Sequence, residues 1–351
     1  MAWTINNGKL YFNSVLYTGN GANNHAITGV GFQPDFVWCK NRTSAQAHAL
    51  VNSVTGRNAL ISNASDAEYV MNAGQDFGTF DSDGFTVLVP NQLNSFNFNN
   101  GSIVSWNWKA GTSSGINTTN STITPAGYSF NQTSGFSIIK YPGNGTNDAK
   151  CPHGLGVAPK MIFIKDLGNA ANWECYNASI GNGKVIYLNL TTAAEATSAR
   201  WRNTSPDSVN WTMGSTTAVN GSGRNYVAYC FADVQGYSKF SSYTGNGNAD
   251  GTFVYTGFKP AFVIIKRTTS NGYDWLMYTS KINGINVMND YLAPNTNAAE
   301  VQNNANQILD FTSNGFKNRG TGASNNGSGA SYIYMAFAEN PFTSSTGTPV
   351  T

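Results

Sequence analysis

The chain has 351 residues, of which only 11% are charged and 13% are aromatic, and its formal net charge is +2. A disordered chain has few aromatic residues and a high net charge, so this composition excludes disorder. The near-neutral charge provides no basic surface for nucleic acid, and no apolar run approaches the ~20 residues of a membrane span. Because its 47 asparagines and 37 glycines disfavour helices, we expect a turn-rich, mainly β protein without nucleic-acid binding or membrane insertion.

Residues 1–12 come first and lack the basic and apolar regions of a secretory signal peptide. We expect them to form an N-terminal arm whose aromatic residues Trp3, Tyr11 and Phe12 can dock on another surface. The four cysteines of the chain are widely spaced, without the paired spacing of zinc sites or the dense spacing of a disulfide framework. The sequence therefore predicts synthesis in a reducing cytoplasm.

A repeated turn opens each of the next three segments. Tyr-x-Gly-Asn-Gly occurs at 17–21, 141–145 and 243–247, and Gly-Asn-Gly favours the positive φ angles of tight turns. A proline follows each tyrosine after 17 or 18 residues, and a lysine follows each proline after six. These anchors are Pro34, Pro159 and Pro260, then Lys40, Lys165 and Lys266. Such ordered recurrence predicts three copies of one structural unit.

An apolar strand lies between each proline and its lysine, and an aromatic strand closes each repeat. Segment 36–39 is apolar at successive positions, so both of its faces should be covered, as in two stacked sheets. The closing strands are 103–108, 226–231 and 332–337. We therefore expect three tandem β-sandwich-like repeats of about 100 residues each, the usual size of such a domain.

One short helix is predicted in each repeat. Three of the five glutamates occupy equivalent positions, and each follows a residue of helix N-cap type by three positions. The glutamates are Glu68, Glu195 and Glu300, and the cap candidates are Ser65, Thr192 and Asn297. In the capping box Ser/Thr-x-x-Glu both side chains bind free backbone amides, so a helix should begin just after each cap.

The predicted organisation has six parts. They are an arm at 1–12, repeat 1 at 13–110, a Ser/Thr/Asn-rich linker at 111–136 with room for one added strand near 127–130, repeat 2 at 137–240, repeat 3 at 241–343 and a tail at 344–351. The start tyrosines are 124 and then 102 residues apart, which argues against closed internal symmetry. We expect a row of repeats, with 2 and 3 rigidly joined and 1 attached more loosely. Three rows could bundle through their aromatic residues, so a homotrimer is expected.

Four strings in these repeats carry a family resemblance. They are Gly-Phe-Gln-Pro-Asp-Phe-Val-Trp at 31–38, Tyr-Cys-Phe-Ala at 229–232, Gly-Tyr-Ser-Lys-Phe at 236–240 and Tyr-Ile-Tyr-Met-Ala-Phe-Ala at 332–338. The chain resembles, over residues 13–343, an uncharacterised repeat of tailed-bacteriophage virion proteins, notably those of marine phages such as cyanophages. The resemblance implies a virion component that contacts capsid or tail proteins: a tail fibre, a knob or a head decoration protein. In such a component we expect the arm 1–12 to attach the protein to the particle through Trp3, Tyr11 and Phe12. No catalytic residues carry over from it.

No catalytic or metal-binding constellation stands out in the sequence. His25, His48 and His153 lack the spacing of metal ligands, and we interpret them as loop or surface histidines. We expect no catalytic residue, no bound metal and no cofactor. The first hypothesis is therefore a non-enzymatic structural protein, made in the host bacterial cytoplasm and located in the virion.

An adhesin that binds a host-surface glycan is the alternative. Trp173 and Trp275 follow an amide or acidic residue at matching places in repeats 2 and 3, where repeat 1 has His48. Aromatic faces beside such groups can stack on sugars, but the same pattern also fits buried strand tryptophans. The sequence does not separate these two interpretations, and a host surface polysaccharide is the second candidate partner.

Overall fold

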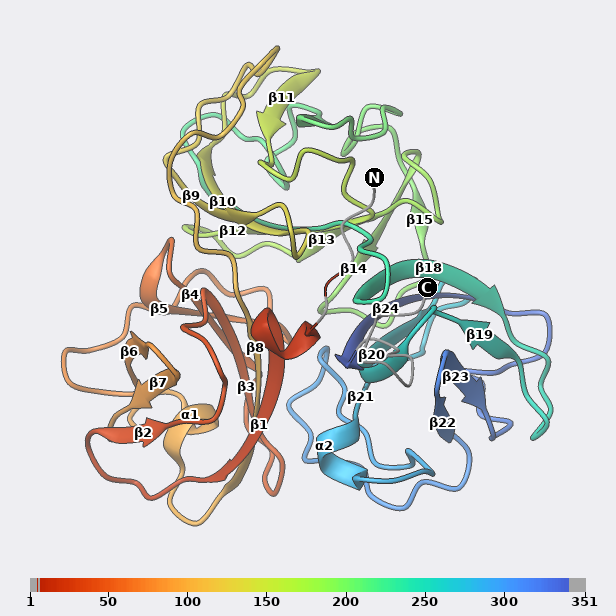
Figure 1. Cartoon of the computed structure of the whole chain (residues 1–351). Helices are drawn as coiled ribbons and strands as arrows, with labels where there is room; N and C mark the ends of the chain where they lie inside the picture. Colours follow the sequence, from red (N-terminus) through yellow and green to blue (C-terminus); the bar gives the residue numbers. More distant parts are fainter. Residues whose placement is uncertain (1–4, 6, 341–351) are drawn as a thin grey trace.

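The computed structural model describes residues 5 and 7–340, and it is mainly β, as expected (Figure 1). Three larger antiparallel sheets surround a common centre, and each has a smaller sheet on its outer side. We call the three parts module 1 (residues 12–108), module 2 (residues 127–231) and module 3 (residues 238–340).

Module 1 has a five-stranded sheet in the order β1-β8-β3-β4-β5 and a three-stranded sheet in the order β2-β7-β6. Its strands are β1 (Phe12–Thr18), β2 (His25–Ile27), β3 (Phe36–Asn41), β4 (Ala49–Asn52), β5 (Gly56–Ile61), β6 (Phe77–Asp81), β7 (Gly84–Val87) and β8 (Ser102–Trp108). The 3-10 turn η1 (Gly8–Leu10) precedes the module, and helix α1 (Asn94–Asn97) precedes its closing strand.

Module 2 has a seven-stranded sheet in the order β15-β14-β13-β12-β17-β10-β9 and a small sheet of β11 and β16. Its strands are β9 (Gly127–Asn131), β10 (Phe136–Pro142), β11 (Ala149–Pro152), β12 (Met161–Asp166), β13 (Glu174–Asn177), β14 (Lys184–Tyr187), β15 (Glu195–Ala196), β16 (Asn210–Met213) and β17 (Asn225–Phe231). Strand β9 lies where the sequence left room for an added strand.

Module 3 has a four-stranded sheet in the order β18-β24-β20-β21 and a three-stranded sheet in the order β19-β23-β22. Its strands are β18 (Ser238–Thr244), β19 (Phe253–Tyr255), β20 (Lys259–Arg267), β21 (Leu276–Thr279), β22 (Leu309–Thr312), β23 (Gly315–Asn318) and β24 (Ser331–Asn340). Helix α2 (Ser280–Asn283) follows β21.

The same strand order recurs in the three larger sheets. The strand that ends in each start turn pairs with the closing strand, and the closing strand pairs with the lysine-bearing strand. The lysine-bearing strand also pairs with the next strand in the chain. The recurring orders are β1-β8-β3-β4, β10-β17-β12-β13 and β18-β24-β20-β21.

The lysine-bearing strand β3 is buried on both faces, as the sequence predicted. Phe36 and Trp38 point into one core that all three modules share, whereas Val37 and Cys39 point into the core between the two sheets of module 1. One face of the sheet is therefore covered by its own small sheet, and the other by the neighbouring modules (Figure 1). Successive side chains of a strand point to opposite faces, so a strand covered twice is apolar throughout.

The modules form a closed ring, so the expected row of repeats is wrong (Figure 1). At the closing seam, Phe12 of module 1 stacks on Phe337 of module 3 with ring centroids 4.9 Å apart. On its other side, module 1 places Phe36 4.5 Å from Tyr229 of module 2, so it is not loosely attached. The ring follows from the second apolar face of each larger sheet, because burying three such faces together removes them from water.

The three predicted capped helices are also wrong. Residues 65–67, 192–194 and 297–300 have no regular structure, and Glu195 begins the short strand β15. These segments extend into the next module and give it their backbone amides. Glu68 donates to Leu167 O at 2.9 Å, Ala194 to Thr268 O at 3.0 Å and Glu300 to Arg42 O at 2.9 Å. A capping box favours a helix only where no better acceptor is near, and here each acceptor lies two residues after a repeat lysine.

Buried asparagines hold the repeated turns in place. The hydroxyl of each start tyrosine donates to the carbonyl just before such an asparagine: Tyr17 to Phe96, Tyr141 to Val219 and Tyr243 to Asn325, at 2.7, 2.7 and 2.5 Å. The asparagines are Asn97, Asn220 and Asn326, and each side-chain oxygen accepts the amide of its turn asparagine at 2.9, 2.9 and 3.1 Å respectively. The tyrosine and the turn are therefore parts of one hydrogen-bonded unit.

The first glycine of each turn is required by a close approach of backbone. A Cβ atom on Gly143 would lie 2.2 Å from the carbonyl oxygen of Gly221. The corresponding distances are 2.2 Å from Gly19 to Phe98 and 2.5 Å from Gly245 to Gly327. The turn motif is thus a packing requirement in all three modules.

We predict that Gly143→Ala lowers the free energy of unfolding by about 2–3 kcal/mol, because the added methyl group must displace backbone. Urea unfolding followed by circular dichroism measures the loss. Gly168→Ala is the matched control, since a Cβ there would meet only Asp166 Oδ1 at 4.0 Å. Equal losses for the two variants would contradict the close-approach explanation.

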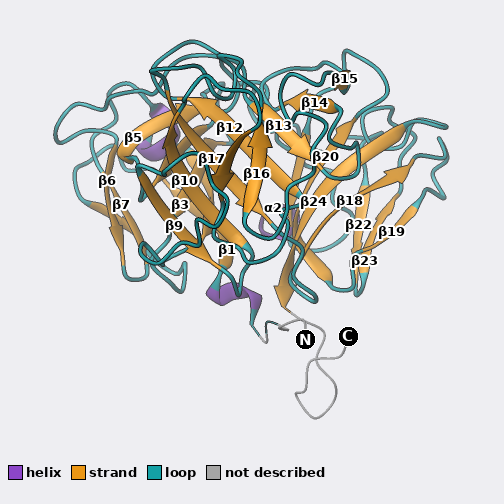
Figure 2. Ribbon diagram, turned by 90° about the horizontal axis from the view of Figure 1, so that it is seen from above, coloured by secondary structure: helices purple, strands orange, loops and turns teal. Residues whose placement is uncertain are grey.

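The first and last described elements lie at the same end of the ring (Figure 2). The turn η1 packs against β24, and a Cβ on Gly8 would lie 3.3 Å from the carbonyl oxygen of Ala338. The strands of the larger sheets run along the ring axis between this end and the opposite one (Figure 2). The ring therefore has two different ends.

Candidate functional site

The three repeat lysines are buried, and two of them lie at the seams between modules. Lys40 Nζ donates to Asn297 O of module 3 at 3.3 Å, and Lys165 Nζ donates to Ser65 O of module 1 at 3.1 Å. Lys266 Nζ instead donates to Tyr273 O within its own module. Burial lowers the pKa of each lysine to about 8. Two of the three lysines therefore donate to residues that the sequence predicted as helix caps, and these hydrogen bonds connect neighbouring modules.

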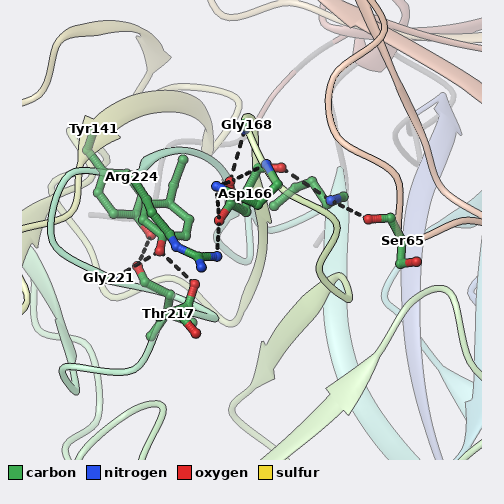
Figure 3. Close-up of polar contacts among 11 residues, drawn as sticks. Ser65, Tyr141, Asp166, Gly168, Thr217, Gly221 and Arg224 are labelled. Atoms are coloured by element: carbon green, nitrogen blue, oxygen red, sulfur yellow. Dashed lines mark hydrogen bonds and ion pairs between the residues drawn. The ribbon is translucent and has the colours of Figure 1, made fainter.

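Next to Lys165, the carboxylate of Asp166 forms an ion pair and hydrogen bonds within module 2 (Figure 3). Asp166 is fully buried; its Oδ2 accepts from Arg224 Nη1 at 2.9 Å and its Oδ1 accepts from Gly168 N at 2.9 Å. Ser65 of module 1 lies on the other side of this strand end (Figure 3). Both carboxylate oxygens therefore accept structural hydrogen bonds, and these bonds hold the end of β12 in place.

The tryptophans considered for glycan binding are buried in the seams. Trp173 Nε1 donates to Ile61 O of module 1 at 2.8 Å, and Trp275 Nε1 donates to Tyr187 O of module 2 at 2.9 Å. Neither ring is accessible to a sugar, so the glycan-binding assignment of these two residues is wrong. The tryptophans are buried, which was the second of the two interpretations left open. Their indole groups also form hydrogen bonds between modules.

His48 and His153 are buried as well, in contrast to the loop or surface positions expected. His48 Nδ1 accepts from Trp38 Nε1 at 3.0 Å, and burial, with the charge of Lys40, lowers its pKa well below the usual value. His153 Nδ1 accepts from Leu155 N at 3.1 Å, and burial lowers its pKa to about 4. Both imidazoles are therefore neutral structural groups.

We predict that acidification from pH 7.5 to pH 5.5 destabilises the protein by about 1.4 kcal/mol for each of these histidines. The unfolded chain takes up protons near pH 6.5, whereas the folded histidines stay neutral down to a lower pH, so stability falls with pH in this window. The substitution His153→Asn keeps an acceptor for Leu155 N and removes the titration. The loss measured by urea unfolding should shrink by about half in the variant; an unchanged loss would refute the assignment.

The three repeat glutamates do not share a site. Glu300 is buried and forms two hydrogen bonds with Arg42 of module 1, at 2.6 and 2.9 Å. Glu68 accepts from Asn58 Nδ2 at 3.3 Å, and burial raises its pKa. Glu195 is exposed and accepts from Tyr187 Oη at 3.0 Å. The prolines Pro34, Pro159 and Pro260 are buried two residues before Phe36, Met161 and Phe262. Pro34 and Pro159 precede their lysine-bearing strands, whereas Pro260 lies within β20.

The residues expected to anchor the N-terminal arm have different positions. Phe12 is buried in the shared core, where it also lies 4.9 Å from the ring of Trp108, so it cannot act as an external anchor. Tyr11 is half-buried beside Tyr237, with ring centroids 6.2 Å apart. Trp3 lies outside the described residues.

A cleft of about 330 Å³ opens between the β17–β18 connection and module 3. Asp233 and Gln235 line it from the connection between β17 and β18, Lys239 from β18, and Tyr255 and Gly257 from the end of β19. Lys239 Nζ lies 2.7 Å from Asp233 Oδ2. The cleft was not predicted, because it departs from the features that the repeats share: Tyr255 stands five residues before Pro260, where the other modules have glycine.

Three general features of residues 7–340 bear on other kinds of site. No group of three metal-ligating side chains occurs in this part of the chain. Within the same described range, no helix is long and apolar enough to cross a membrane. The four cysteines are all buried and unpaired.

The sequence matches a protein family described as Domain of unknown function (DUF7483), over residues 7–341. The chain belongs to this family. The match covers the three modules in one stretch, so the sequence pattern of the family extends over the whole ring. No curated protein and no solved structure matches the chain.

Proposed function

We propose that this member of the DUF7483 family is a non-enzymatic structural component of a bacteriophage virion, exposed as a tail fibre, a knob or a head decoration protein. The observation that carries the proposal is the closed ring, in which three modules share one aromatic core. A rigid unit of this kind suits a permanent position on a particle, and the resemblance of the repeats to virion proteins points the same way. Its partners are then other capsid or tail proteins.

The proposal treats the modules as three copies of one β-sandwich-like repeat. The common strand order and the common turn contacts of Tyr17, Tyr141 and Tyr243 support this. We predict that Pro142→Thr, which gives module 2 the turn sequence of the other modules, changes the free energy of unfolding by less than about 1 kcal/mol. Urea unfolding tests this, and loss of the fold would contradict the equivalence of the turns.

Localisation on particles tests the virion role directly. Antibodies against the chain should label purified phage particles in electron micrographs, at one defined place on the head or tail. Protein found only in the particle-free fraction of infected cells would overturn the proposal. Hydrolysis of host polysaccharide by the purified chain, lost on a single acid-to-amide substitution, would overturn its non-enzymatic part.

Attachment and self-association belong to the same proposal. Since Phe12 is part of the shared core, the N-terminal anchor is tested by deleting residues 2–4 only, which keeps η1 and β1. Full incorporation of the truncated chain into particles would refute the anchor. A homotrimer of whole chains is tested by light scattering of the purified protein and by crosslinking on the particle, and a monomer in both would refute it.

A further inference from the structure

We propose that the cleft between the β17–β18 connection and the end of β19 binds a neutral carbohydrate, with Tyr255 as a stacking face and Asp233 and Lys239 as hydrogen-bonding groups. This ligand site goes beyond the structural role proposed above. It lies in another place than the buried tryptophans and rests on different residues.

The aromatic face is exposed and held in place. Tyr255 is 61% exposed, and its ring lies over Gly257, where a Cβ atom would be 3.6 Å from the tyrosine hydroxyl. Its backbone carbonyl accepts from the hydroxyl of the buried Tyr334 at 3.5 Å. A sugar ring presents C–H groups that pack on such a face.

The polar groups are oriented before any ligand arrives. Asp233 Oδ1 accepts from Phe240 N at 2.8 Å, and Oδ2 accepts from Lys239 Nζ at 2.7 Å. Each carboxylate oxygen retains a further lone pair, and the ammonium group retains further N–H donors. Because the two charges compensate each other, a neutral ligand that both donates and accepts hydrogen bonds fits better than an ion, and sugar hydroxyls do both.

Side chains of neighbouring strands occupy the corresponding region of the other two modules. In module 1, Asn13 Nδ2 crosses it and donates to Gly29 O and Val30 O at 3.2 and 3.0 Å. In module 2, the added strand β9 brings the Phe130 ring so near that a Cβ on Gly154 would lie 2.8 Å from it. Module 3 has Tyr255 in place of these glycines and keeps the space open. Because module 3 differs from the other two modules at this position, the chain would carry one such ligand site.

The volume of the cleft limits the size of the ligand. Its 330 Å³ lies at the lower end of the range of small-molecule sites, about 300–1,000 Å³. It therefore takes one sugar residue in contact with Tyr255. Phe253 is 45% exposed and lies two positions earlier on the same face of β19, so a second sugar residue can continue along the strand.

Saturation-transfer NMR on the full chain tests the site, with glucose, galactose, mannose, N-acetylglucosamine and their disaccharides as probes and sialic acid as an anionic comparison. We expect transfer to at least one neutral sugar, and an affinity at least about tenfold lower in Tyr255→Ala. Asp233→Asn should weaken binding too. Phe253→Ala should weaken binding of the disaccharide but not of its monosaccharide.

Tyr69→Ala is the matched control, because Tyr69 is a 36% exposed tyrosine of module 1 outside the cleft. It should leave binding unchanged, and thermal unfolding by circular dichroism shows that each variant is folded. The site is refuted if no probe shows transfer, if sialic acid binds better than the neutral sugars, or if Tyr255→Ala has no more effect than Tyr69→Ala. These measurements use purified chain and defined sugars, so they fail independently of localisation on a particle.

Discussion

Replacing Arg42 with methionine should destabilise the protein by about 3–5 kcal/mol, the cost of leaving a buried charge without its partner. The Glu300 side chain is 1% exposed and reaches Arg42 from module 3 through two hydrogen bonds. In the variant its carboxylate keeps only Gln302 Nε2, at 3.1 Å, as a side-chain donor. Urea unfolding followed by circular dichroism measures the loss.

Two further variants give this prediction its controls. Arg202→Met breaks an ion pair of the same type whose aspartate, Asp148, is 62% exposed, so it should cost less than about 1 kcal/mol. The double variant Arg42→Met with Glu300→Gln removes the unpaired charge and should recover most of the loss. If Arg42→Met costs no more than Arg202→Met, the closing seam does not depend on this pair.

Replacing Trp108 with alanine should also cost about 3–5 kcal/mol, because a large side chain leaves a cavity that the shared core cannot fill. The indole lies 5.1 Å from the ring of Phe36, 6.4 Å from Phe231 of module 2 and 5.7 Å from Phe337 of module 3. Because one side chain contacts all three modules, we expect faster amide hydrogen exchange in the larger sheets of all of them.

Trp211→Ala is the matched comparison for that experiment. Trp211 is equally buried, but it belongs to the core between the two sheets of module 2. Its loss should raise hydrogen exchange mainly in module 2. An exchange increase confined to module 1 in Trp108→Ala would show that the modules unfold independently and that the shared core does not couple them.

The sequence predicts well the features that depend on local contacts, such as turns and apolar strands. The turn Tyr-x-Gly-Asn-Gly is recognisable because Gly143 and Gly145 have no alternative there: one meets backbone and the other has a φ of +69°. The uninterrupted apolar run around Trp38 likewise requires cover on both faces, whatever supplies it. These features depend on contacts that recur in every module.

The ring and its seams depend on contacts between distant parts of the chain. Ser65 and Glu68 form a correct capping pattern, but Lys165 and Leu167, about a hundred residues later, provide better partners for their backbone groups. The tryptophans were ambiguous for a similar reason. The backbone amide of Trp173 donates to Asn189 Oδ1 while its indole enters the seam, so a polar neighbour does not indicate exposure.

The shared aromatic core also determines how this chain can associate with further copies. The apolar faces that three separate β-domains would use to recognise one another are already joined inside one chain. These inward apolar faces are therefore no longer available for association. Further copies can contact only the outer sides of the ring and its two different ends. Any larger assembly must be built from these weakly charged, turn-rich surfaces, so subunits can be added or lost without opening the hydrophobic interior of the ring.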